Sequence, residues 1–146
     1  MKPTMLKIAS AALVCLMLFS LASCSSDKSS AVEKAFTDEG YEVSKSDANN
    51  ETVKPLLGLL LNEEQIEHVS EYEIMLCVPE GLLNVGNTAI VIKFPSAGDL
   101  KDFLTTEKDG EKDTSTYDKA KEDGNINGNC LLITAGSEAR DIFKKA

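Results

Sequence analysis

Apolar and polar positions along the chain follow two different periods, one typical of strands and one typical of helices. After residue 40, two-residue alternation or a short apolar run occurs four times, and helix-like spacing fills most of the intervals between these segments. The pattern predicts strands over residues 41–46, 71–78, 87–94 and 130–135. It predicts helices over residues 31–39, 52–69, 97–104 and 117–123, and a last helix after Ser137.

Capping residues support several of these boundaries. Asn62 is followed three positions later by Gln65, the spacing of a capping box, so the 52–69 segment is expected to break and restart near Asn62. Pro95 ends the third predicted strand, and Ser96 is a good N-cap for the helix that follows. The stretch 105–116 is polar and charged, and we interpret it as a solvated loop.

From residue 41 onward, the predicted order is strand, helix, strand, strand, helix, strand. This βαββαβ order favours an α+β fold, a ferredoxin-like antiparallel sheet with helices on one face and extra helices at both ends. Its expected strand order is 4-1-3-2, which places the second and fourth strands at opposite edges. The uncovered face of such a sheet would be free for water or a partner. Another α+β arrangement of the same elements is the alternative.

The N-terminal segment has a composition different from the rest of the chain. A short charged head, Met1 to Lys7, precedes an apolar run of about 12 residues from Ile8 to Phe19, and Leu21-Ala22-Ser23-Cys24 follows. The run is shorter than the roughly 20 residues that a spanning helix needs, and small residues at its end are typical of a cleaved export signal. The segment resembles the lipobox of bacterial prolipoproteins. That resemblance implies cleavage before Cys24, a diacylglycerol on its sulfur and acylation of its new amino group.

Processing at Cys24 would divide the chain into three parts. Residues 1–23 are then a signal peptide, residues 24–30 a lipidated cysteine with a flexible tether, and residues 31–146 a single α+β domain. Removing Lys2 and Lys7 leaves 13 basic and 24 acidic residues, a net charge of −11. This charge argues against nucleic acid as a partner. We expect a membrane protein held by lipid on the extracytoplasmic face, and the resemblance implies that Ser25 would permit sorting to an outer membrane if the host has one.

Two cysteines, Cys77 and Cys130, lie outside the signal and the lipobox. An oxidising compartment would favour a disulfide between them. The predicted topology favours two separate buried thiols, because opposite edge strands are too far apart for a bridge. Both alternatives remain open from the sequence.

The segment Asp123-Gly124-Asn125-Ile126-Asn127-Gly128 matches the first six positions of a calcium loop. In such a loop, Asp123, Asn125 and Asn127 would direct oxygen ligands at one ion, and a glycine would allow the sharp turn. The twelfth position is Thr134 instead of glutamate, and a predicted strand follows instead of a helix. A polar turn between helix and strand is the competing interpretation.

A second arrangement of ligand-type side chains lies in the predicted helix before residue 70. Glu64 and His68 are four residues apart, on one helical face, and Glu71 is adjacent. One histidine with two carboxylates could hold a divalent ion, although the chain has no second histidine to complete such a site. A solvated helix face is the alternative. A small hydrolase is a further alternative, but no G-x-S-x-G or phosphate-binding glycine motif is present to support it.

The connection between the second and third predicted strands, residues 79–87, is long and contains Leu82, Leu83 and Val85. These apolar side chains predict either packing over the core or contact with a partner protein or ligand. The sequence therefore predicts a non-catalytic, lipid-anchored binding or scaffolding protein of the cell envelope with no cofactor. A small calcium-binding envelope protein is the alternative.

Overall fold

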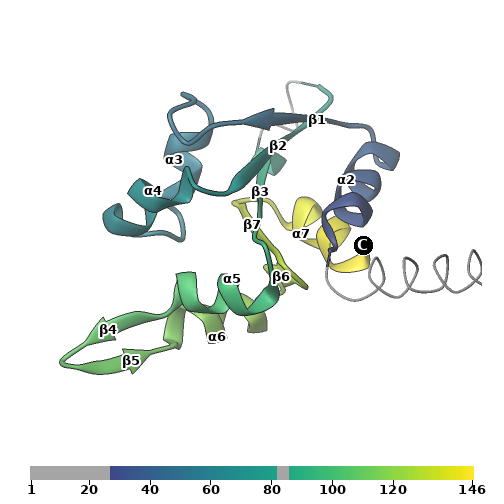
Figure 1. The fold of residues 1–146 in the computed structure, drawn as a ribbon. Coiled ribbons are helices and arrows are strands. Elements are labelled where there is room, and N and C mark those ends of the chain that lie inside the picture. The colour runs from purple at the N-terminus through teal and green to yellow at the C-terminus, as the bar shows by residue number, and fades with distance from the viewer. Residues whose placement is uncertain (1–26, 82–85) are drawn as a thin grey trace, which may run out of the picture.

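The computed structural model describes residues 27–81 and 86–146, and Figure 1 shows its ribbon. In chain order, the helices of these residues are α2 (Ser29–Asp38), α3 (Val53–Leu57), α4 (Glu63–Val69), α5 (Ala97–Leu104), α6 (Ser115–Glu122) and α7 (Ser137–Lys145). The strands are β1 (Tyr41–Ser46), β2 (Glu73–Pro79), β3 (Ala89–Lys93), β4 (Thr106–Lys108), β5 (Glu111–Asp113), β6 (Ile126–Asn127) and β7 (Cys130–Thr134). The chain is therefore a mixed α+β protein, as predicted.

Five of these strands form one antiparallel sheet in the order β1-β2-β3-β7-β6. The predicted ferredoxin-like order was wrong: β1 lies at an edge and pairs with β2 along its whole length, from Tyr41 opposite Pro79 to Ser46 opposite Ile74. The physical reason is that α3 and α4 bring the chain back directly beside β1. Strand β2 therefore pairs with β1, and no third strand lies between them. Helices α2 and α7 are the predicted extra elements at the two ends of the fold.

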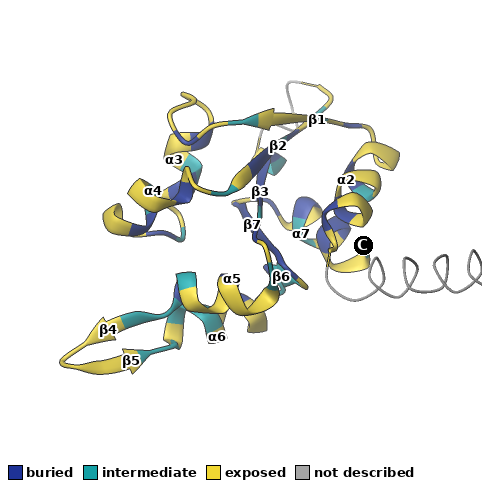
Figure 2. Ribbon diagram, in the orientation of Figure 1, coloured by how far each residue is buried: buried dark blue, intermediate teal, exposed yellow. Residues whose placement is uncertain are grey.

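Both faces of the sheet are covered, so the predicted free face does not exist. On one face, α2 and α7 bury Val32, Phe36 and Phe143 against alternate strand residues that include Met75, Val91 and Leu132. On the other face, α3 to α6 pack against the intervening strand residues. This second cluster includes Val53, Leu57, Val69, Leu100, Leu104 and Ala120 from the helices, and Ile74, Ile90, Ile92, Leu131 and Ile133 from the strands. Figure 2 shows the central strands buried between these two layers.

Local sequence signals explain where several elements begin. The Asn62 side chain accepts a hydrogen bond from the Gln65 backbone N–H at 2.8 Å, and the Gln65 side chain accepts one from the Asn62 N–H at 3.0 Å. This reciprocal capping box starts α4, as predicted. The Ser96 hydroxyl likewise accepts from the Asp99 N–H and starts α5. The last helix, expected after Ser137, includes Ser137 as its first residue, and Gly136 holds the N-cap position.

The stretch 105–116 is not the open loop that its charge suggested. Strands β4 and β5 pair as a two-stranded hairpin, with Lys108 opposite Glu111. Asp109 and Gly110 form the two-residue turn, with φ values of 54° and 79°. Two successive positive φ values are typical of a type I′ turn, for which Asp-Gly is a preferred pair. This hairpin projects from the body beside α5 and α6 (Figure 1).

The N-terminal end of the described chain is bound to the body earlier than the predicted 24–30 tether allows. Helix α2 begins at Ser29, and Asp27 accepts hydrogen bonds from the Ser29 N–H at 2.9 Å and the Ser29 hydroxyl at 2.6 Å. Asp27 also forms an ion pair with Lys93 of β3 at 3.1 Å. Residues 27–30 therefore belong to the folded body. Within the described ranges, no helix is long and apolar enough to cross a membrane.

Candidate functional site

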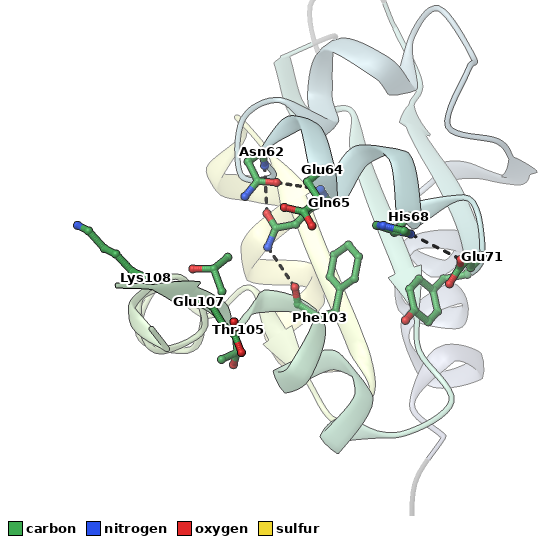
Figure 3. Close-up of a pocket in the computed structure, with 11 residues that line it drawn as sticks. Asn62, Glu64, Gln65, His68, Glu71, Phe103, Thr105, Glu107 and Lys108 are labelled. Carbon is green, nitrogen blue, oxygen red and sulfur yellow. Dashed lines mark hydrogen bonds and ion pairs between the residues drawn. The ribbon is translucent and has the colours of Figure 1, made fainter. Parts of the chain in front are cut away.

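A groove of about 740 Å³ lies between α4 and the segment that leads from α5 into β4 (Figure 3). Its volume is within the usual range for a ligand-binding pocket, roughly 300–1,000 Å³. Its lining residues come from α4 and the turn after it, and from the segment after α5: Asn62, Glu64, Gln65, His68, Glu71, Tyr72, Phe103, Thr105, Thr106, Glu107 and Lys108. The groove lies over the sheet face that α3 to α6 cover, not the face covered by α2 and α7.

A buried glutamine fixes the distance between the two walls of the groove. Gln65 is only 8% exposed, and its side-chain amide donates a hydrogen bond to the Phe103 carbonyl oxygen at 3.1 Å. The same side chain closes the capping box with Asn62. Gln65 therefore joins the start of α4 to the end of α5, as Figure 3 shows. The cap could be predicted from the sequence but this link could not, because the partner of Gln65 is a backbone carbonyl 38 residues away.

An aromatic cluster forms the base of the groove. The ring centroids of Tyr72 and Phe94 are 4.4 Å apart, and Phe103 lies 5.5 Å from Tyr72 and 5.2 Å from Phe94. Phe94 is fully buried, whereas Tyr72 and Phe103 are half-buried and also line the groove. Burial, followed by the nearby carboxylates of Glu71 and Asp99, raises the pKa of the Tyr72 hydroxyl. The base thus offers partly exposed, uncharged aromatic surface.

The walls above this base are predominantly acidic. Glu64 and Glu71 come from α4 and the turn after it, Glu107 comes from β4, and Lys108 is the one lysine among the lining residues. His68 Nδ1 lies 3.6 Å from Glu71 Oε1, and their side chains are 60% and 67% exposed. The predicted trio of Glu64, His68 and Glu71 therefore does lie along one groove. Across residues 27–81 and 86–146, no group of three or more His, Cys, Asp or Glu side chains is placed to hold a metal ion.

The residues of the candidate calcium loop have other partners. Asp123 forms an ion pair with Lys119 at 3.1 Å, and Asn125 Oδ1 accepts a hydrogen bond from Arg140 at 3.0 Å. Asn127 directs its amide nitrogen at the carbonyl oxygens of Phe143 and Ala146. Thr134, at the twelfth position, donates its hydroxyl to the Thr88 carbonyl oxygen. The segment thus joins α6 to β6 and fastens α7.

The remaining candidate residues are placed as follows. Cys77 and Cys130 are free and buried, the arrangement that the sequence analysis favoured, and burial raises the pKa of both thiols to about 12. The two cysteines do not lie on opposite edge strands, as expected, but on the two strands that flank β3. They are separated because they pair with opposite ends of β3, Cys77 with Ala89 and Cys130 with Lys93. Cys24, Leu82, Leu83 and Val85 lie outside the described residues, so lipidation and the partner contact of the 79–87 loop stay predictions.

Comparison with known proteins adds no relative from which a function could be transferred. No family model, no curated protein and no solved structure matches this chain.

Proposed function

We propose that this chain is a lipid-anchored, extracytoplasmic binding protein of the cell envelope, and that the groove beside α4 receives its partner. The Leu21-Ala22-Ser23-Cys24 segment supports the anchor through its resemblance to a lipobox. The groove supports the binding role, and it is the observation that carries the proposal. In a host with two membranes, Ser25 after the lipidated cysteine would permit sorting to the outer one.

The chemistry of the groove favours a basic peptide segment that also carries an apolar side chain. Glu64, Glu71 and Glu107 give the lining an excess of negative charge over Lys108. Tyr72 and Phe103 offer aromatic surface at the base, against which an aliphatic or aromatic side chain would pack and over which a cation would be attracted. The acidic balance of the whole chain would attract a basic partner at longer range.

A binding role suits this groove better than catalysis does. The His68 and Glu71 side chains are both more than half exposed, so water surrounds the one imidazole–carboxylate pair in the lining. Acid–base and electrostatic catalysis gain most where water is excluded and the reacting groups are held in one geometry. An aromatic centre with a polar, accessible rim is, in contrast, typical of interfaces between proteins.

Site-specific photo-crosslinking in intact cells of the host tests this proposal. A photoreactive residue at Thr106, inside the groove, should capture a defined envelope protein through a segment rich in lysine or arginine. The same residue at Glu33, exposed on α2, is the matched control and should not capture that segment.

Charge reversal then tests whether the groove carboxylates hold the partner. Glu64→Lys combined with Glu107→Lys should reduce the capture about tenfold, if each exposed pair contributes roughly 0.5–1 kcal/mol. Glu42→Lys, on the exposed side of β1, should leave capture unchanged. Equal capture from Thr106 and Glu33, or capture that ignores the reversal of the groove charges, would contradict the proposal.

A further inference from the structure

The contacts of Asp27 and Lys28, the first residues that the structure describes, limit how an anchored protein would lie on a membrane. Asp27 is held by Ser29 of α2 and by Lys93 of β3. The next residue, Lys28, donates its backbone N–H to Asn129 Oδ1 at 2.9 Å, and Asn129 is 1% exposed. Asn129 in turn donates to the Phe94 carbonyl oxygen at 2.8 Å. The start of the described chain is thus fastened to α2, to β3 and to the turn between β6 and β7.

Covalent geometry limits how far the lipid can be from this fastened residue. Cys24 precedes Asp27 by three residues. Consecutive Cα atoms are 3.8 Å apart, so the two Cα atoms can be separated by at most about 11 Å. Because Asp27 is held to the body, a lipid on Cys24 would keep the body close to the bilayer surface.

The part of the body around Asp27 contains several features that suit a phospholipid headgroup layer. The aliphatic stem of Lys28 lies against Gly128 in the β6–β7 turn, and the side chain of Lys144 lies over Gly124. Lys145 is exposed in the last turn of α7, whose carbonyl oxygens accept from Asn127. The Asp27 carboxylate is already paired with Lys93. Although the chain is acidic, this end therefore presents Lys28, Lys144 and Lys145 together.

We propose, on the basis of the lipidation at Cys24 in the proposed function, that the end formed by Asp27, Lys28, the β6–β7 turn and the last turn of α7 rests against the bilayer headgroups. The partner is a phospholipid surface, and the short covalent link selects this end over the others. In Figure 1, α2 and α7 lie on one side of the sheet, and α4 and the β4–β5 hairpin lie on the other. The groove is consequently held on the part of the body remote from the bilayer, open to a partner in the envelope.

Depth-dependent fluorescence quenching on the full, processed protein in liposomes tests this orientation. One label is attached at Lys145→Cys, near the proposed contact, and one at Lys112→Cys, exposed on β5. Labelling is selective because Cys77 and Cys130 are buried. A phosphatidylcholine with a nitroxide on its headgroup should quench the label at position 145 strongly and the label at position 112 weakly. A ten-residue Gly-Ser insertion between Ser26 and Asp27 should remove most of the quenching at position 145 and leave the body folded.

The outcomes separate this inference from the function on which it rests. Co-flotation with liposomes, measured first, reports the lipid anchor. Loss of flotation in the unaltered protein would overturn the lipidation and the orientation together. Flotation with equal quenching at positions 145 and 112, or quenching at position 145 that the insertion does not change, would overturn the orientation alone.

Discussion

At the scale of single residues, the most consequential charge is that of Asp27. Its carboxylate accepts two hydrogen bonds from Ser29, and these bonds, together with Lys93 and Asn129, hold its pKa well below the ordinary value of 3.8. A carboxyl group with a lowered pKa in the folded state stabilises the fold above its unfolded pKa, and this stabilisation is lost as the pH falls through the folded value. The contacts that hold Asp27 to the body therefore also make the stability of the fold depend on pH.

We expect Asp27→Asn to lower the free energy of unfolding by about 1 kcal/mol at pH 7, the scale of a helix-start hydrogen bond to an exposed carboxylate. Below about pH 4 the difference in unfolding free energy between the two proteins should shrink. In that pH range the Asp27 carboxyl of the unfolded wild-type chain is increasingly protonated. Urea unfolding of both proteins at pH 7 and pH 3 measures it. Glu42→Gln, at an exposed position, serves as the control and should change little at either pH. A difference that persists undiminished at pH 3 would contradict this assignment.

Gly136 is a residue whose lack of a side chain matters for packing. A Cβ at this position would lie 2.1 Å from Asn87 Oδ1, 2.7 Å from its Cα and 2.8 Å from the Gly86 carbonyl oxygen. Two of these atoms are backbone, so the chain between β7 and α7 would have to shift. We expect Gly136→Ala to cost about 1–3 kcal/mol, the usual range for overpacking.

The matched control for this substitution is Gly98→Ala in α5. A Cβ there would meet only Ser96 Oγ, at 3.6 Å, an ordinary contact. Alanine is the better helix former, so Gly98→Ala should be neutral or stabilising by up to about 1 kcal/mol. Thermal melts of both variants give the comparison, and similar midpoints for the two would show that the close approach at Gly136 is absent.

At the scale of elements, Gln65 connects α4 to α5. Gln65→Ala removes one half of the capping box and the hydrogen bond to Phe103, and it leaves the half-buried Phe103 carbonyl with one partner fewer. We expect a loss of about 1–2 kcal/mol in unfolding free energy. Partner capture through the groove should weaken as well, because its walls are no longer joined. Glu67→Ala, on the exposed side of α4, is the control and should affect neither stability nor capture. Wild-type stability in Gln65→Ala would refute the role of this link.

Most elements could be predicted from the sequence because their determinants are local. The Asn62–Gln65 capping box, the Ser96 cap and the apolar alternation in β2 each lie within a few residues, and each is present in the structure. The Asp109-Gly110 turn was also a local signal, and the charges around it obscured it. The hairpin was not predicted, because the stretch was interpreted from its charged composition and not from the preference of Asp-Gly for a type I′ turn.

The order of the strands could not be predicted in the same way, because pairing depends on contacts between distant segments. One signal could have corrected the layer arrangement. Residues 89–92 and 130–133 are continuously apolar, and a strand of this kind is typically buried on both faces. The groove had no such signal. Glu64, His68 and Glu71 were identified as a group, but the opposite wall at 103–108 lies some 40 residues later in the chain.

At the scale of the whole molecule, the two helical layers leave the sheet without a free face, so the proposed partner would have to bind another surface. The groove beside α4 is the surface that we propose for it, and the fastened start of α2 is the proposed link to a lipid anchor on the other side of the sheet. The proposed membrane location depends on a covalent lipid at Cys24.

The most direct test of that claim is the intact mass of the protein purified from host membranes. We predict a chain that begins at Cys24 and carries the added mass of a diacylglycerol, with or without a further acyl group on its amino terminus. Cys24→Ala should abolish the added mass and release the body from the membrane or leave residues 1–23 attached. A membrane-extracted wild-type chain without lipid mass, or one that begins elsewhere, would show that Cys24 is not the lipid anchor.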